Sequence, residues 1–363
     1  MLCIEKEVFE KMSKWEENVR KVVPYVPGEQ PQRAHMIKLN TNENPYPPAP
    51  GVQKVLESFD VDRLRLYPDP VVSKLNNAIA KCYGVKGSQV FSGVGSDDVL
   101  AMIFMTFFNS KTPILFPDIT YSFYDVWADM LRIPYNKIPL DEKLCIRTED
   151  YKTECGGIVF PNPNAPTGEL LPLAQVEEII RNNPEVMVVV DEAYIDFGGE
   201  SALPLMEKYN NVIVVQTFSK SRSMAGSRIG FAISNEKAIK YLNDVKYSFN
   251  SYTMDALTIE LGAAAICDKE YFESTREKII ATREWTKSEL KKLGFTFGDS
   301  MSNFIFATHE KYPATELYQV LRENDIYVRY FSKPERINNY LRISIGTDEE
   351  MRTFVAFLQK YMK

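Results

Sequence analysis

Lysine, aspartate and serine side chains stand where three apolar stretches of the sequence end. Lys220 and Asp191 each follow a run of β-branched residues, and Ser96 and Asp97 follow a glycine, Gly95. A lysine at the end of a buried strand is costly unless it is paired or used chemically. An isolated Ser-Lys pair is also compatible with a solvated turn, so the surrounding elements must decide between the two.

The apolar stretches predict strands, and several are apolar throughout, as expected for strands covered by helices on both faces. Helical patterns separate most of them, for example residues 97–108 and 172–182. This alternation predicts an α/β fold with a mostly parallel sheet flanked by helices. The predicted strands are residues 89–93, 113–116, 156–160, 186–190, 212–218 and 228–234.

The C-terminal third follows a different pattern, which predicts a second unit. A long amphipathic helix begins near residue 270, three apolar stretches follow, and a last helix begins at Glu349. We therefore expect a large α/β domain over residues 51–265 and a small α+β domain over residues 266–363. Residues 1–50, with a polar N-terminal helix and the irregular proline-rich arm "LNTNENPYPPAP", are expected to pack with the small domain.

The polar residues at the strand ends should meet, because ligands of open α/β sheets lie beyond the C-terminal ends of the strands. That edge would combine an anion cradle at a helix N-terminus, a buried carboxylate and a lysine. Pyridoxal 5′-phosphate (PLP) requires all three, for its phosphate, its ring nitrogen and its aldehyde. No P-loop and no Gly-x-Gly-x-x-Gly fingerprint favours a nucleotide instead.

Composition excludes several other classes of protein. The net charge of −6 and the lack of a dense basic run argue against a nucleic-acid binder. Only His35 and His309 are present, so the sequence predicts neither a multi-histidine metal site nor a Ser-His-Asp triad. Five scattered cysteines, a charged N-terminus and no stretch long enough to span a bilayer lead us to expect a cytoplasmic protein without membrane partners.

Several motifs together resemble the fold-type I PLP-dependent aminotransferases of the class II subgroup. They are "SKSRSMAGSRIG", "PNPNAPTG" and "DEAY", supported by "LNTNENPYPP", "LYPDP", "TYSFY", "YVRYF" and "YLRISIGT". The match covers nearly the whole chain and is most similar to the histidinol-phosphate aminotransferase family. With these motifs counted, Lys220 is expected to be the lysine that forms a Schiff base with PLP.

The resemblance implies a role for each residue of the cofactor site. Asp191 would keep the pyridine nitrogen protonated, Lys220 would move the substrate proton, and Tyr194 would contact the phenolic oxygen of PLP. Tyr121 would lie over the ring. The phosphate would be surrounded by Gly95, Ser96, Asp97, Ser219 and Arg228.

One position departs from the family pattern. The asparagine expected before Pro166, which would donate to the phenolic oxygen, is Ala165 in this sequence. The preceding Asn164 is therefore predicted to reach the cofactor through a shifted loop, with Tyr194 carrying the contact alone as the alternative.

The resemblance also implies the substrate site and the assembly. Arg329 and Arg342, joined by Tyr25, would bind the anionic groups of the substrate, because guanidinium forks match carboxylate and phosphate. Tyr67 would reach the PLP phosphate of a neighbouring subunit, so we expect a homodimer with shared active sites.

The expected reaction converts histidinol phosphate and 2-oxoglutarate into imidazole-acetol phosphate and glutamate, as a step of histidine biosynthesis. An aromatic or broad-specificity aminotransferase and a PLP-dependent threonine-phosphate decarboxylase remain alternatives. A PLP-binding module without turnover is disfavoured by the intact set of Asp191, Lys220 and Arg228.

Overall fold

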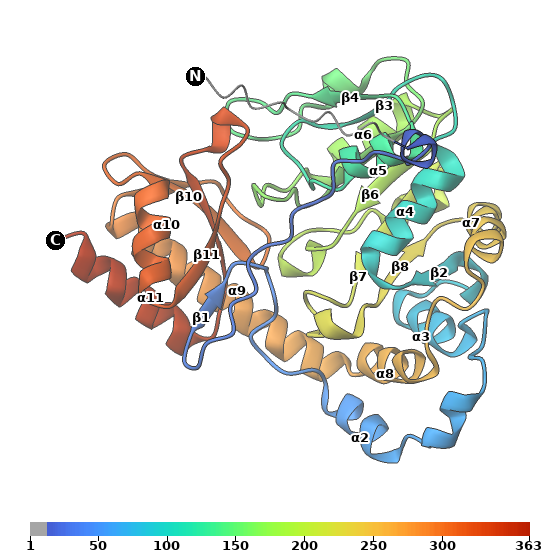
Figure 1. Ribbon diagram of the computed structural model, residues 1–363, viewed down its shortest axis with the longest axis horizontal. Helices are drawn as coiled ribbons and strands as arrows, with labels where there is room; N and C mark the ends of the chain where they lie inside the picture. Colours follow the sequence, from blue (N-terminus) through green and yellow to red (C-terminus); the bar gives the residue numbers. More distant parts are fainter. Residues whose placement is uncertain (1–12) are drawn as a thin grey trace, which may run out of the picture.

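Two β-sheets form the framework of the protein, whose computed structural model describes residues 13–363 (Figure 1). The larger sheet has seven strands within these residues, and β8 runs antiparallel to both of its neighbours while the other strands are parallel. Their order across the sheet is β2 (Val90–Gly93), β8 (Gly230–Ile233), β7 (Val212–Thr217), β6 (Val188–Asp191), β5 (Ile158–Pro161), β3 (Ile114–Pro117) and β4 (Tyr135–Ile138).

Helices cover both faces of this sheet, which explains its continuous apolar strands. Val189 and Ile213 pack in one core with α4, α5 and α7, while their neighbours Val188 and Val212 pack on the opposite face with α6. Every residue of β6 and β7 is buried as a result. The helices of this half are α2 (Pro50–Ser58), α3 (Ser73–Tyr83), α4 (Gly95–Phe107), α5 (Tyr124–Leu131), α6 (Leu173–Asn182), α7 (Glu236–Phe249) and α8 (Ala256–Cys267).

The smaller sheet alternates between a helix-covered face and a face turned to the rest of the molecule. Leu341 and Ile343 of one strand and Val328 of another pack against the helices, so Arg342 and Arg329 point the other way. The strand order is β1 (Ile37–Leu39), β11 (Ile326–Tyr330), β12 (Tyr340–Ser344), β10 (Phe304–His309) and β9 (Phe295–Phe297), and the helices are α9 (Lys269–Lys292), α10 (Ala314–Glu323) and α11 (Asp348–Tyr361).

The N-terminal segment runs between the two sheets (Figure 1). It begins with the short helix α1 (Lys14–Glu17), contacts α5 through the Arg20 guanidinium and the Met130 carbonyl, and joins the small sheet as β1, parallel to β11. The predicted N-terminal helix otherwise lies outside the described residues.

The predicted α/β fold with a mostly parallel sheet is confirmed, while three short strands were not predicted. These are β1, β4 and β9, of three or four residues each, and they carry too few apolar positions to show a period in the sequence. Among residues 13–363, none of the helices combines the length and the apolar character needed to cross a membrane.

Candidate active site

A cavity of about 360 Å³ lies at the edge of the large sheet where strands β6 and β7 end. Its size lies within the usual range of small-molecule sites. The parallel strands deliver their C-terminal residues to this one place, which is the reason residues far apart in sequence meet here. Of the predicted cofactor residues, it is lined by Ser96, Asp97, Tyr121, Asp191, Tyr194, Ser219, Lys220 and Arg228.

Lys220 lies half-buried in the cavity wall, three residues beyond the end of β7. Its Nζ donates to the Thr41 carbonyl at 3.3 Å and lies 5.8 Å from the centre of the Tyr194 ring. The Asn44 side chain donates to the carbonyls of Lys220 and Ser221, which fixes the backbone that carries the lysine. The amine is therefore held at the cavity by neutral partners that leave it available for a ligand.

Asp191 is the last residue of β6, and its carboxylate is buried, with only 4% of the residue exposed. Burial raises its pKa to about 6, although hydrogen bonds from the Tyr124 hydroxyl (2.9 Å) and the Ala193 amide (3.3 Å) oppose the shift. Both partners are neutral groups. A cationic ligand group beside this carboxylate would restore its ordinary preference for the charged form.

The N-terminus of α4 packs closely against Arg228 and against Gly230 of β8, and its Ser96 and Asp97 line the cavity. Gly95 has φ +86°, and a Cβ on it would collide with the Arg228 guanidinium; a Cβ on Gly230 would collide with the backbone of Ser96. Arg228 is held there by Asp97, whose carboxylate accepts from its Nη2 at 3.1 Å and from the Tyr121 hydroxyl at 2.6 Å. Backbone amides, a helix N-terminus and a guanidinium thus converge, as an anion requires.

Arg329 and Arg342 lie directly opposite each other on the antiparallel strands β11 and β12. Each guanidinium carbon lies 5.6 Å from the centre of the Phe331 ring, so the two cations flank one aromatic side chain. Arg342 is half-buried, and desolvation of its guanidinium lowers its pKa. Its Nη2 donates to the Asn40 carbonyl at 3.2 Å, while its buried Nε has no partner among the described residues. Two neighbouring cations with donor capacity left over call for an anion.

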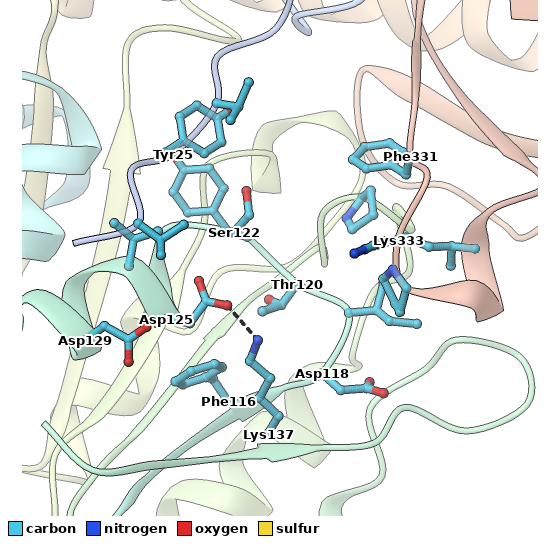
Figure 2. A pocket seen from close by; sticks show the side chains of 18 of the residues that line it. Tyr25, Phe116, Asp118, Thr120, Ser122, Asp125, Asp129, Lys137, Phe331 and Lys333 are labelled. Carbon is cyan, nitrogen blue, oxygen red and sulfur yellow. Dashed lines mark hydrogen bonds and ion pairs between the residues drawn. The ribbon is translucent and has the colours of Figure 1, made fainter. Parts of the chain in front are cut away.

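A second cavity, of about 440 Å³, adjoins the first at Tyr121, which lines both (Figure 2). Tyr25 of the N-terminal segment faces it from one side and Phe331 of the small sheet from the other, and Arg329 also lines it. The Tyr25 ring rests on Phe123, with 4.3 Å between the ring centres. Of the three predicted substrate residues, Tyr25 and Arg329 line this second cavity, whereas Arg342 lines neither cavity.

Asn164 does not reach the cavity, which contradicts the predicted cofactor contact. The residue is 2% exposed, and its amide donates to the Ile119 carbonyl and the Thr167 hydroxyl, each at 3.0 Å, while its oxygen accepts from Thr120. These bonds fix the loop and leave the side chain no free group. Ala165, not Asn164, faces the cavity.

Tyr67 does not line either cavity of its own chain. It is 83% exposed, and its ring lies 4.7 Å from that of Tyr252, measured between centres.

The sequence did not predict the residues that hydrogen-bond to the site residues and position them. Tyr124 bonds Asp191, and the arm residues Thr41, Asn42 and Asn44 bond Lys220 or Tyr194. The polar stretch "TNEN" in the proline-rich arm could have indicated these contacts. A solvated loop does not need two asparagine side chains so close together.

Comparison with known proteins identifies the family. Residues 34–358 match the family described as "Aminotransferase class I and II". The chain belongs to the class I and II aminotransferases. Among curated relatives, this aminotransferase is 52% identical to the histidinol-phosphate aminotransferase of Lactococcus lactis subsp. cremoris (strain SK11), over 96% of this chain and 98% of the relative. It is also 52% identical to that of Brachyspira hyodysenteriae, with the same coverage.

A solved structure confirms the fold of this aminotransferase. The histidinol-phosphate aminotransferase of Sinorhizobium meliloti in complex with pyridoxal-5′-phosphate superposes with a TM-score of 0.81 at 23% identity, covering 90% of each chain. The prediction of a PLP-dependent aminotransferase is confirmed by the family and by the relatives.

The cavity of the aminotransferase fits PLP. The N-terminus of α4 with Ser96 and Arg228 suits the phosphate, the buried Asp191 suits a cationic ring nitrogen, and Lys220 suits the aldehyde. The volume also leaves room for a planar ring between Tyr121 and the strand ends.

Proposed function

We propose that this aminotransferase transfers the amino group of histidinol phosphate to 2-oxoglutarate, giving imidazole-acetol phosphate and glutamate. The observation that carries the proposal is the cross-strand pair Arg329 and Arg342. Arg329 lines the second cavity, and the buried Nε of Arg342 has no partner among the described residues. Such a pair suits a phosphate monoester in one half-reaction and a dicarboxylate in the other. The substrate named for the relatives at 52% identity supports the same reaction.

The proposed residue roles are those that the family resemblance implies, and the cavity lining supports them. When bound, PLP supplies an electron sink that stabilises negative charge on the amine-bearing carbon of the substrate. Asp191 holds a proton on the ring nitrogen, and Lys220 takes the proton from the amine-bearing carbon as a general base. Arg228 and the α4 N-terminus anchor the phosphate, and Tyr194 donates to the phenolic oxygen. Tyr121 covers the ring.

The proposal is tested by adding one amino donor at a time to the purified holoenzyme. Histidinol phosphate and glutamate should each convert the bound cofactor to its aminated form, which is followed by the loss of visible absorption. Phenylalanine should react more slowly, and threonine phosphate should release no carbon dioxide. Faster conversion by phenylalanine than by histidinol phosphate would favour an aromatic aminotransferase instead.

Arg329→Ala should lower kcat/KM for histidinol phosphate by about 10- to 150-fold, the value of one charged hydrogen bond. Glutamate should be affected less, because Arg342 is proposed to bind the group shared by both substrates. Arg329→Lys should restore activity only in part, since a point charge cannot reproduce a two-pronged contact. The measurement is the rate of each half-reaction against substrate concentration.

The matched control is Arg352→Ala, which removes an arginine that stacks on Trp285 on the helix-covered side of the small domain. This control should leave both half-reactions unchanged. If Arg329→Ala left histidinol phosphate turnover intact while it impaired phenylalanine, the phosphate-binding role would be wrong.

We also propose that residues 266–363 form the small domain and residues 51–265 the PLP domain. The prediction that residues 1–50 pack with the small domain holds for β1, whereas Arg20 and Tyr25 contact α5 and Phe123 of the large domain, and residues 1–12 lie outside the described residues. Pairing of β1 with β11, and the position of α9 at the start of the small domain, support these boundaries.

A homodimer with shared active sites is proposed from the surface around Tyr67. Exposed apolar side chains cluster in the same segment and on the nearby end of α7, where Phe249 is 69% exposed. Lys246 of that helix donates to the Pro70 carbonyl at 2.7 Å, so the two segments form one surface. A second copy of the chain is the proposed partner, because Tyr67 is exposed and lies outside the two cavities described above. The apolar residues are Val61, Leu64, Leu66, Val71, Phe249 and Tyr252.

Mixing two impaired chains should restore activity if sites are shared. Lys220→Ala and Tyr67→Phe chains, co-expressed in equal amounts, should give about a quarter of the wild-type activity, because half of the dimers are mixed and each has one intact site. Each variant alone must first prove impaired, and sedimentation should show a dimer. A fully active monomer, or no gain on mixing two impaired variants, would contradict the shared site.

A further inference from the structure

Asn42 connects the small sheet to Tyr194 in the wall of the cofactor cavity. It is 1% exposed and adopts a left-handed backbone conformation, with φ +56°, in which few residues other than glycine and asparagine are comfortable. Its Nδ2 donates to the Tyr194 hydroxyl oxygen at 2.9 Å. Its carbonyl accepts from the Asn303 side chain at 2.9 Å, so the residue is held on both sides.

The orientation of the Asn42 amide is fixed by Ser344. The Ser344 hydroxyl accepts from the Asn42 backbone amide and donates to Asn42 Oδ1, each at 2.9 Å. Because Oδ1 is the acceptor of that bond, the other end of the amide must be the NH₂ group, which can only donate. The Tyr194 hydroxyl oxygen therefore accepts a hydrogen bond from Asn42, and its own O–H remains available to donate to another partner.

Among the described residues, no acceptor takes a hydrogen bond from the Tyr194 hydroxyl. Its ring packs edge-on against Phe304, with 5.1 Å between centres, and the residue lines the cavity beside Ala165. Ala165 has no group that could donate there. Tyr194 is therefore the side chain that must supply the hydrogen bond to the phenolic oxygen.

We propose that Asn42 is a positioning residue that directs the Tyr194 hydroxyl proton into the cavity, toward the phenolic oxygen of bound PLP. The inference rests on the proposed function, because it requires PLP in this orientation. Asn42 acts through Tyr194 and does not touch the substrate. Through Tyr194, it compensates for the asparagine donor that the family pattern has at position 165, where this chain has alanine.

The test measures the visible absorption of the holoenzyme without substrate as a function of pH. A hydrogen bond to the phenolic oxygen stabilises its negative charge and so favours loss of the proton from the nitrogen that joins PLP to the lysine. Asn42→Gly, which keeps the left-handed backbone, should raise the midpoint of the absorption change by about 0.5–1 pH unit. Ala165→Asn in the same chain should bring the midpoint back toward the wild-type value.

Asn42→Asp gives a second measurement if Asn42→Gly does not fold or does not retain PLP. A carboxylate of almost the same shape can still accept from Ser344, but it must also accept from Tyr194, which turns the hydroxyl proton away from the cavity. The midpoint should then rise at least as far as in Tyr194→Phe.

Asn40→Ala is the matched control. It removes another buried arm amide, which donates to the Glu29 carbonyl and does not contact Tyr194, so the midpoint should not move. An unchanged midpoint in Asn42→Gly and Asn42→Asp, with a normal chromophore, would overturn this inference alone. A wild-type protein without any PLP chromophore would instead overturn the proposed function.

Discussion

Replacing Lys220 with alanine should reduce amino transfer by about 10⁴-fold, at the upper end of what a positioned general base contributes. The variant loses both the covalent bond to PLP and the amine that takes the substrate proton. Lys220→Arg should be equally impaired, because a guanidinium keeps the charge but neither forms that bond nor gives up its proton. The measurement is the rate of each half-reaction with saturating PLP.

Chemical labelling identifies the lysine independently of the rate. Borohydride reduction of the wild-type holoenzyme should attach PLP to the peptide that contains Lys220, as determined by mass spectrometry. The same treatment of Lys220→Ala should leave that peptide unlabelled. Labelling of another lysine in the wild-type protein, such as Lys38 beside the arm, would refute the assignment.

Asp191→Asn should reduce amino transfer by about 10²- to 10³-fold, as for the loss of one preorganised electrostatic group. A neutral amide does not hold a proton on the ring nitrogen, so PLP becomes a weaker electron sink. The Tyr124 hydroxyl can still bond the amide oxygen, and the cavity should keep its shape. The rates of both half-reactions should fall by the same factor. Arg329→Ala, in contrast, should affect histidinol phosphate more than glutamate.

Asp191→Asn should lower activity, yet it should stabilise the PLP-free protein at neutral pH. Burial raises the Asp191 pKa from 3.8 to about 6. The folded state therefore binds this proton more tightly, and the stabilisation is complete below about pH 4 and lost as the pH rises through about 6. The shift corresponds to about 3 kcal/mol at neutral pH.

PLP-free Asp191→Asn should therefore melt at a higher temperature than the PLP-free wild type at pH 7.5, and the difference should shrink toward pH 4. Addition of PLP should raise the Tm of the wild type more than that of the variant. Parallel melting curves for the two PLP-free proteins across this pH range would contradict the buried charge. Glu192 also has a raised pKa, of about 7, but it is present in both proteins and cancels in the comparison.

The sequence predicted the parts of the site that depend on local order. Asp191 ends the buried strand β6 and Lys220 follows the buried strand β7 by three residues, and parallel strands of that kind deliver their last residues to one edge of the sheet. Arg329 and Arg342 were placed by resemblance, and strand alternation then explains why both point away from the helix-covered face of the small sheet. These positions need only the strand pattern and the sheet topology.

The remaining contacts could not be read from the sequence, because they depend on which long-range partner a side chain meets. Asn164 was expected at the cofactor, yet its side chain bonds Ile119 and Thr120 of a distant segment and Thr167 of its own loop. Tyr124 was quoted only as part of a motif, and its contact with Asp191 joins residues 67 positions apart. The arm was expected to be irregular, and nothing in its composition shows that it passes between the two sheets.

The threading of the arm determines when this active site can form during synthesis. Thr41 and Lys220 are separated by 179 positions, and Asn42 and Ser344 by 302. A nascent chain can complete the strands that carry Asp191 and Lys220 while Arg342 and Ser344 have not yet been translated. Since domains generally fold as units during translation, the PLP half can fold early, while the arm must wait for β12. Catalytic competence is therefore acquired late, and incomplete chains cannot turn over substrate.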